Sequence, residues 1–407
     1  MAKGPNPMII IKSLRFAVRS AFAVFVSVGA LVLCGGTLAQ SAAPSAPSGS
    51  FGLDVKTLGA YGDCKHDDTV ALQSAVGQLS GRTLHFPAGC YLITQPIRIP
   101  FAVGFRIVGE GQTGTKIQQQ TDNTPIFVFT QELTHSWEVR DLEFAWAKPQ
   151  PSQNTNSVAI LFSTTTSSGG GLFNFTLSHL TFDNGYRGIY LGPGNHGALP
   201  VWGFVIEGIV AQREMSGATI NLGPVPGTGM PRCILRDIYS QQASSEPQVT
   251  LHHCTSGTVD NIEDNNGVDT SLDLSGNWAM SVRAIHIEMH HMLHPNHPVI
   301  SAENSKIDFE GVSVYIWSEV PGDYYLFSNV AGGGTLSIRN VALIGTAPET
   351  NRPSATNSPD AHSHLLRLNG AVKLLDVEGV DLNHADISRK DDSSTSQKLT
   401  TLARPPQ

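Results

Sequence analysis

A short motif recurs along the chain from about residue 139 onward. It consists of an apolar residue, any residue, a turn-forming residue and a second apolar residue. Its copies begin at residues 139, 177, 206, 235, 259, 282, 309, 338 and 374. The second apolar residues are mostly 23 to 29 residues apart, with longer steps where loops are inserted. A repeat of this period is typical of a solenoid, in which stacked coils share one continuous hydrophobic core.

The turn position of the motif carries residue types that adopt left-handed backbone angles at low cost. They are Asp141, Gly208, Asp237, Asn261, Gly311, Asn340 and Asp376. This pattern predicts one tight bend in every coil. The preceding position carries charges of alternating sign: Glu207, Arg236, Asp260, Arg283, Glu310 and Arg339. We interpret these charges as structural pairs between neighbouring coils, each contributing about 0–1 kcal/mol because the pairs are exposed.

The first 39 residues resemble an export signal. Lys3, Lys12, Arg15 and Arg19 are the only charges before residue 40, an apolar run follows to Cys34, and small residues near Ala39 suit cleavage. The apolar run is short for a stable membrane span, so none is expected after removal of the signal. An uncleaved anchor is the alternative. We therefore expect a secreted or periplasmic protein.

The remaining chain divides by composition. Residues 40–50 are rich in Ala, Pro and Ser and are predicted to form a flexible linker. Residues 51–387 are expected to form the solenoid, and the polar residues 388–407 a disordered tail. The sequence leaves the oligomeric state open.

Charge limits the classes of partner. The formal net charge is −8, and loss of the four positive charges of the signal makes it −12. No basic cluster is interleaved with aromatic residues, so a nucleic-acid partner is not expected. A polyanionic glycan would need a local arginine patch or a bridging divalent cation.

The segment from Leu53 to Gln119 contains three further motifs. Residues 59–69 read GAYGDCKHDDT, residues 86–93 read FPAGCYLI, and residues 108–111 read VGEG. This series resembles the opening of the pectate-lyase-like superfamily, with its GAxGDGxxDD pattern. The resemblance implies an all-β fold, a right-handed parallel β-helix with a short N-terminal capping helix. The superfamily includes polysaccharide hydrolases, lyases, epimerases and phage tailspikes, so the motifs are specific for fold and not for chemistry.

The adjacent Asp67 and Asp68 precede a segment with apolar residues at positions 72, 75, 76 and 79, which is the helical period. We expect a short helix over the open end of the coil, with a carboxylate accepting its first backbone N–H groups. A catalytic carboxylate dyad is the alternative interpretation of the pair.

Two cysteines depart from the family pattern. Cys64 stands where glycine is usual and Cys90 where threonine is common, and both belong to the same cap. For an exported chain we predict a Cys64–Cys90 disulfide, with two free thiols as the alternative. Cys233 and Cys254 then remain for a second bridge, and the absence of a CxxC pair gives no support to a zinc finger.

A second extended run in each coil places alternate side chains on one outer face. Tyr190, Asn221 and Thr250 are expected to bind substrate there, with Asp273 in the same column and His291 in a nearby loop. In the resembled family, substrate usually lies along this face. A polysaccharide is therefore the expected partner.

Two kinds of catalytic chemistry fit the residues near this face. Hydrolysis needs two carboxyl groups, for which Asp269, Asp273 and Glu214 are the candidates. Elimination needs a base and a cation, for which Arg187 or Arg213 would serve with Ca²⁺ held by acidic residues. His252 would support either reaction. No cofactor is required by the sequence, and Ca²⁺ is expected only for a lyase.

Histidines are concentrated between residues 286 and 297. His290 with His294, or His286 with Glu288, offer metal-ligating groups, but the order His-Glu-x-x-His is absent and prolines indicate a loop. We therefore expect no resident metal here.

The catalytic signatures of polygalacturonases and of alginate epimerases are also absent from the coils. The sequence favours a carbohydrate-active protein that cleaves a polysaccharide by hydrolysis or β-elimination. A non-catalytic glycan-binding or envelope protein is the alternative.

Overall fold

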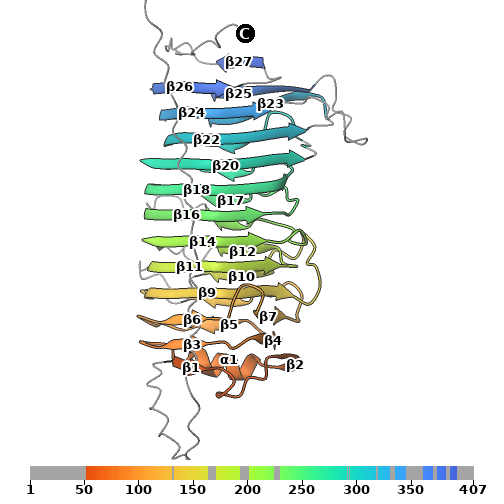
Figure 1. Cartoon of the computed structure of the whole chain (residues 1–407), viewed down its shortest axis with the longest axis vertical. Helices are drawn as coiled ribbons and strands as arrows, with labels where there is room; N and C mark the ends of the chain where they lie inside the picture. Colours follow the sequence, from red (N-terminus) through yellow and green to blue (C-terminus); the bar gives the residue numbers. More distant parts are fainter. Residues whose placement is uncertain are drawn as a thin grey trace, which may run out of the picture. The chain divides into compact units, whose positions relative to one another are not determined.

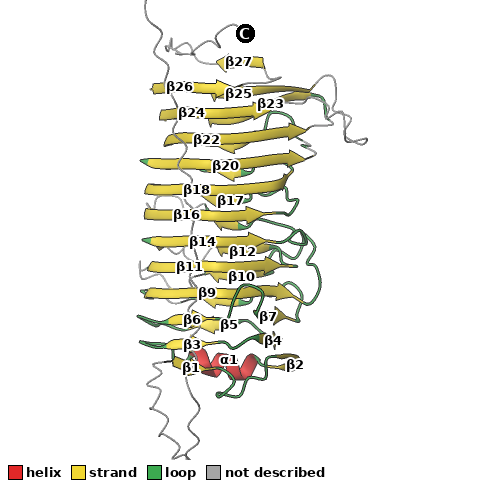
Figure 2. Ribbon diagram, in the orientation of Figure 1, coloured by secondary structure: helices red, strands yellow, loops and turns green. Residues whose placement is uncertain are grey.

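The computed structural model describes residues 52–130, 133–163, 171–192, 201–223, 230–290, 292, 294–317, 320–330, 335–344, 361–369, 374–381 and 386–391. All of them belong to one compact unit that spans residues 50–407. The described elements are parallel strands in two sheets, with one helix, α1 (Thr69–Val76) (Figure 2). No helix among these residues is long and apolar enough to span a bilayer.

The larger sheet, sheet A, contains the long strands. Its main path runs through β1 (Gly52–Asp54), β3 (Thr83–His85), β6 (Arg106–Val108), β9 (His135–Trp146), β11 (Leu172–Asp183), β14 (Phe204–Ala211), β16 (Met230–Ser240), β18 (Cys254–Gly267), β20 (Met280–His290), β22 (Lys306–Trp317), β24 (Thr335–Ile344) and β26 (Leu374–Asp381). Off this path lie β2 (Asp63–Asp67), β4 (Gly89–Ile93), β7 (Thr115–Gln119) and β13 (Val201–Trp202).

The smaller sheet, sheet B, contains mostly short strands. In spatial order they are β5 (Ile97–Ile99), β8 (Phe127–Phe129), β10 (Val158–Phe162), β12 (Arg187–Leu191), β15 (Ile220–Leu222), β17 (Val249–Leu251), β19 (Leu272–Asp273), β21 (Pro298–Ser301), β23 (Gly322–Val330), β25 (Ala361–Asn369) and β27 (Asp386–Asp391).

From β9 onward the chain alternates between the two sheets, so each coil contributes to both, and equivalent strands stack along the unit (Figure 1). The expected fold class, a right-handed parallel β-helix with a short capping helix, is confirmed. β27 ends at Asp391, beyond the boundary expected at residue 387. The predicted signal and linker, and residues 392–407 of the predicted tail, lie outside the described residues.

The interior of the coil is built from columns of apolar side chains. Val139, Leu177, Ile206, Leu235 and Val259 pair in register from β9 to β18, and all are fully buried. The second apolar position of the motif forms a parallel column. Because each inward side chain sits above its counterpart, the core continues from coil to coil without interruption.

The predicted bend is present in successive coils of sheet A. Six of the seven expected residues have positive φ, between 53° and 69°: Asp141, Gly208, Asp237, Asn261, Gly311 and Asn340. His179 and Ala284 occupy the same column with φ of 51° and 52°. Gly208 is required by space as well, since a Cβ there would lie 2.7 Å from the His179 ring.

The assignment of Asp376 to this column is wrong. The strand register pairs Asp376 with Ser337 and Glu378 with Arg339, so residue 379, a glycine, lies opposite Asn340. The motif in β26 therefore begins three residues later than the sequence pattern indicated.

The alternating charges lie on adjacent coils, as expected. Glu207, Arg236, Asp260, Arg283, Glu310 and Arg339 pair in this order along sheet A. Arg236 contacts Glu207, Arg283 lies 3.8 Å from Asp260, and Arg339 lies 3.6 Å from Glu310. These arginines are held by structural pairs on sheet A.

The helix α1 covers the first coils at one end of the stack (Figure 1). Its inward residues Leu72, Ala75 and Val76 are fully buried, and Leu79 beyond it is 1% exposed, which confirms the predicted apolar face. Val70 points away from the stack and is 82% exposed.

The two aspartates before α1 have separate structural roles. Asp67 accepts hydrogen bonds from the backbone N and the hydroxyl of Thr69 at 3.0 and 2.5 Å, so Asp67 supports the start of the helix. Asp68 holds the preceding turn, accepting from the backbone N atoms of Tyr61 (2.6 Å) and Gly62 (3.0 Å). Asp68 is 1% exposed, which leaves it no role as an accessible catalytic dyad partner.

Two disulfides join neighbouring coils. Cys64 is bonded to Cys90 across the paired strands β2 and β4, and Cys233 is bonded to Cys254 across β16 and β18. Cys64 has φ of 61°, a left-handed conformation that accounts for glycine in the family pattern. The crosslink thus fixes a cysteine at a position where glycine would fit without strain.

The first prediction tests whether the disulfide stabilises the chain and whether position 64 favours glycine when the disulfide is absent. Replacing both cysteines, as Cys64→Gly with Cys90→Thr, should destabilise the chain by about 2–4 kcal/mol through loss of the crosslink. The matched variant Cys64→Ala with Cys90→Thr should be less stable by a further ~1 kcal/mol, since alanine is strained at this φ. Denaturant unfolding measures both, and equal stabilities of the two variants would contradict the explanation.

Candidate functional site

The outer face of sheet B carries the predicted column of polar side chains. Tyr190, Asn221, Thr250 and Asp273 pair in register from β12 to β19, and the column continues to Ser301. The alternation of side chains along each short strand produces this column. Thr250 is only 5% exposed, so it offers a ligand little surface.

Asp273 contacts His252 on this face. Asp273 ends β19, His252 follows β17 on the preceding coil, and His252 Nε2 lies 2.8 Å from Asp273 Oδ2. Asp273 Oδ1 accepts a hydrogen bond from the Ser275 hydroxyl at 2.6 Å. Burial raises the pKa of Asp273, but the contacts with His252 and Ser275 outweigh it, so the pKa lies below its ordinary value. Asp273 is therefore held as a carboxylate.

Glu303 lies beside this pair on the next coil. It follows Ser301, the partner of Asp273 in the register, by two residues and is exposed. Partial burial and the charge of Asp273 raise the pKa of Glu303, although His252 lowers it. Sequence reasoning missed Glu303, and the available signal was the outward alternation that continues past Ser301. We call Asp273, His252 and Glu303 the sheet B cluster.

Asp269 does not form a dyad with Asp273. It lies in the loop before β19, where its Oδ2 is 2.7 Å from His294 Nδ1 and its Oδ1 is 3.6 Å from His297 Nδ1. His286 and His290 instead contact Glu288, at 3.4 and 3.1 Å. Of the two pairings expected for metal binding, His286 is in contact with Glu288, whereas His294 contacts Asp269 on the preceding coil.

Arg187 is held in a structural contact. Its guanidinium makes a two-point contact with Glu246, with Nε 2.8 Å from Oε2. It also lies over the rings of Tyr186 and Tyr190, at 4.6 and 4.2 Å. Burial lowers the pKa of Arg187, but the bonds to Glu246 outweigh it and raise the pKa above its ordinary value. An arginine held in this way is poorly suited to act as a base.

Arg213 and Glu214 lie apart from the sheet B cluster. Arg213 lines a cavity of about 480 Å³ together with Tyr239, Gln241, Asn265, Asn266, Glu288 and His290, at the ends of sheet A strands. Glu214 is exposed, and its charge is the second contribution, after burial, to a raised pKa of Asp183. His291, which is expected to bind substrate from a nearby loop, lies outside the described residues.

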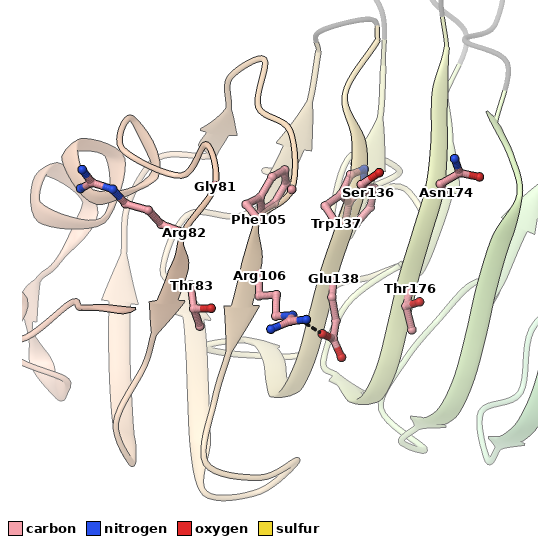
Figure 3. A pocket seen from close by; sticks show the side chains of 11 residues that line it. Gly81, Arg82, Thr83, Phe105, Arg106, Ser136, Trp137, Glu138, Asn174 and Thr176 are labelled. Carbon is pink, nitrogen blue, oxygen red and sulfur yellow. Dashed lines mark ion pairs between the residues drawn. The ribbon is translucent and has the colours of Figure 1, made fainter. Parts of the chain in front are cut away.

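A second cavity of about 590 Å³ lies near the cap, on the outer side of strands β3, β6, β9 and β11 (Figure 3). Polar side chains line it, including Thr83, Asn174 and Thr176, and Arg106 pairs with Glu138 across it at 3.2 Å. The opposite charges of Arg106 and Glu138 neutralise each other at an exposed surface. The cavity can accommodate a polar ligand but contains no pair of carboxyl groups.

Ca²⁺ prefers six to eight oxygen ligands. Among the described residues, three side chains with convergent ligand atoms occur only at Asp269, His294 and His297, and two of those atoms are nitrogen. This donor set does not fit Ca²⁺.

Comparison with known proteins agrees with the architecture. Residues 52–146 match the family model described as "Rhamnogalacturonase A/epimerase, pectate lyase-like". The fold is pectate-lyase-like. No protein of curated function matches the sequence of this β-helix significantly.

Solved structures show the same fold at low sequence identity. The Streptococcus pneumoniae surface protein and adhesin PfbA has a TM-score of 0.50 and 11% identity, with 83% of this chain and 99% of PfbA covered. The A-module of mannuronan C-5 epimerase AlgE6 of Azotobacter vinelandii has a TM-score of 0.42 and 13% identity, over 87% of this chain and 100% of the module.

A third similar structure is the catalytic unit of the GH87 α-1,3-glucanase of Streptomyces thermodiastaticus. It has a TM-score of 0.44 and 13% identity, over 88% of this chain and 72% of that unit. At these identities the likeness concerns the fold.

One carboxyl group next to the smaller cavity is fully buried. Asp264 has no exposed surface, and it accepts hydrogen bonds from the Ser271 hydroxyl at 2.6 Å and the Asn266 backbone N at 3.3 Å. Burial raises the pKa of Asp264 to about 7, and the two hydrogen bonds only partly offset it. The folded chain therefore retains this proton over a pH range in which an unfolded aspartate loses it.

The second prediction concerns this proton. Stability should fall as pH rises from 3.8, the ordinary aspartate pKa, to about 7, and then level off. Asp264→Asn removes the titration, so at pH 8 the variant should be more stable than the wild type, by on the order of a few kcal/mol. At pH 4 the difference should vanish.

Thermal unfolding between pH 4 and pH 8 measures this effect. Asp260→Asn, on the same strand but half exposed, removes another aspartate carboxyl group and serves as the matched control. A constant difference between Asp264→Asn and wild type at every pH would show that Asp264 does not titrate as described.

Proposed function

We propose that this β-helix hydrolyses a polysaccharide on the outer face of sheet B, with Asp273 and Glu303 as the two carboxyl groups. The observation that carries the proposal is that the surroundings move the two pKa values in opposite directions, down for Asp273 and up for Glu303. Two carboxyl groups separated in this way provide one ionised base and one protonated acid at the same pH.

Each carboxyl group has a definite role. Asp273, ionised and held by Ser275 and His252, acts on the anomeric side of the sugar as base or nucleophile. Glu303, which is exposed and has a raised pKa, donates its proton to the oxygen of the leaving sugar. The two groups stand on adjacent coils, one strand spacing of ~4.8 Å and two residues apart, so a glycosidic bond fits between them.

His252 is a positioning residue in this mechanism. Its contact with Asp273 at 2.8 Å fixes the carboxylate and favours its charged form. His252 also lowers the pKa of Glu303 and so limits how far burial and the charge of Asp273 can raise that pKa. His252 therefore sets the separation between the two pKa values.

Several features of the chain support a glycan as the substrate. The column of polar groups beside Asp273, including Tyr190 and Asn221, runs across successive coils and suits a linear chain of sugars. The matching family model also describes carbohydrate enzymes.

Hydrolysis fits this site better than β-elimination. Arg187, the candidate base on sheet B, is bound to Glu246, and the one group of three ligand side chains found among the described residues supplies two nitrogens and a single carboxylate. The two disulfides suit an oxidising compartment, so we propose a secreted or periplasmic location for this activity.

The third prediction tests the two carboxyl groups. Asp273→Asn and Glu303→Gln should each lower turnover about 10²–10⁴-fold while substrate binding persists, since each change removes a proton-transfer group and preserves shape. The measurement is release of reducing ends from a panel of bacterial and plant polysaccharides, recorded together with absorbance near 235 nm.

The matched control is Asp183→Asn, which removes a carboxyl group of raised pKa on sheet A and should leave turnover unchanged. Absorbance at 235 nm would reveal unsaturated products and so elimination. Binding of a glycan by the wild type without any cleavage would identify the chain as a glycan-binding protein and refute the proposed hydrolysis.

The fourth prediction is an acidic activity optimum. Activity is lost as pH falls through the pKa of Asp273, below 3.8, because the base becomes protonated. It is also lost as pH rises through the pKa of Glu303, above 4.5, because the acid loses its proton. A plot of kcat/KM against pH should therefore be bell-shaped, and a rate that still rises above pH 8 would contradict these roles.

A further inference from the structure

The loops that precede β19 and β21 bring one carboxylate and two imidazoles together. Asp269 belongs to the first loop, and His294 and His297 to the second, on the next coil. One ligand atom from each of the three residues lies within 4.8 Å of the others. Both imidazoles direct Nδ1 at the carboxylate, at 2.7 and 3.6 Å. We call these three residues the His–Asp triad.

The carboxylate of Asp269 is incompletely satisfied. The Asp269 side chain is 7% exposed, and its Oδ1 has no hydrogen-bond partner among the described residues. A buried oxygen without a partner costs free energy that a bound cation would recover. An ion pair between Asp269 and His294 gives Oδ2 of Asp269 a partner. It gives no partner to Oδ1 and no reason for His297 to lie beside the carboxylate.

The two histidines are held in place by a turn. His297 N donates to His294 O at 3.4 Å, Pro295 follows His294, and Asn296 has φ of 69°, which is the pattern of a type II β-turn. The two imidazoles therefore leave the same turn on either side of Pro295 and Asn296. The turn thus fixes the backbone positions from which the two imidazoles project towards Asp269.

The turn is in addition supported by the next coil. Asn296 N donates to the backbone O of Asp323 at 2.7 Å. A Cβ at Gly322 would lie 2.4 Å from Pro295 Cβ, so the glycine lets β23 approach the turn closely. Three successive coils thus contribute to one preorganised site, which is the arrangement that metal centres require of their supporting residues.

We propose that the His–Asp triad binds a divalent transition-metal ion, with Zn²⁺ as the probe ion. Two imidazole nitrogens and one carboxylate suit Zn²⁺ and its first-row neighbours, whereas Ca²⁺ and Mg²⁺ prefer oxygen. His294 and His297 are 56% and 54% exposed, so a fourth coordination position faces solvent. The bound ion joins two coils at the edge where sheet B strands begin.

The fifth prediction is tested by direct metal binding. The whole chain, purified without a polyhistidine tag and stripped with chelator, should bind one Zn²⁺ in a calorimetric titration. Elemental analysis after dialysis should give the same ratio. Asp269→Asn, His294→Gln and His297→Gln should each weaken Zn²⁺ binding at least about tenfold.

The matched control is His85→Gln, which removes another histidine that lies beside a carboxylate, with its Nε2 3.3 Å from Glu110. It should bind Zn²⁺ as the wild type does. Thermal unfolding in chelator checks that every variant is folded, and Co²⁺ substitution gives an absorption spectrum that reports the ligand set.

Equal Zn²⁺ binding by the wild type and the three triad variants would overturn the proposal. So would a wild type that binds less than one equivalent of Zn²⁺ at micromolar concentration. The readout is bound metal rather than turnover. The result is therefore independent of whether Asp273 and Glu303 cleave a glycan.

Discussion

The strand register between successive coils determines the rest of this structure. Each coil hydrogen-bonds in parallel to the one before it, so a residue sits about 4.8 Å from its equivalent and faces the same way. Apolar positions consequently become continuous core columns, bends recur at one corner, and opposite charges meet on sheet A. The same rule builds the sheet B cluster from residues that are far apart in sequence: His252, Asp273 and Glu303 come from three neighbouring coils.

The sequence predicted the features that repeat. Asp and Asn residues at the corners, such as Asp237 and Asn261, indicate a left-handed backbone conformation because these residue types adopt it at low cost. Their spacing gives the length of a coil. The Asp376 assignment failed because inserted loops lengthen the last intervals, so two neighbouring patterns in β26 fit the motif equally well. The charge ladder was predictable because each of its members occupies a fixed place in the motif.

The site was less predictable because its contacts join loops that do not repeat. Asp269 and Asp273 are four residues apart, but Asp269 lies before the strand and turns towards the histidines of the next coil. Arg187 is a reasonable candidate base from its place in the sequence, but the sequence does not reveal its contact with Glu246, 59 residues away. Glu303 belongs to no motif, and the raised pKa that marks it arises from partial burial and from the charge of Asp273 beside it.

The Cys64–Cys90 bond lies within the first coils, and the other disulfide lies midway along the stack. Stacked coils contact mainly their neighbours, so opening begins at an end and advances coil by coil. Because a disulfide crosslinks the first coils, we expect local unfolding to begin at the last coils. Unfolding that advances from there reaches the disulfide between β18 and β16 before it reaches the cap. Amide exchange and proteolytic nicking should therefore be graded along the chain, and the N-terminal coils form the most persistent part of the molecule.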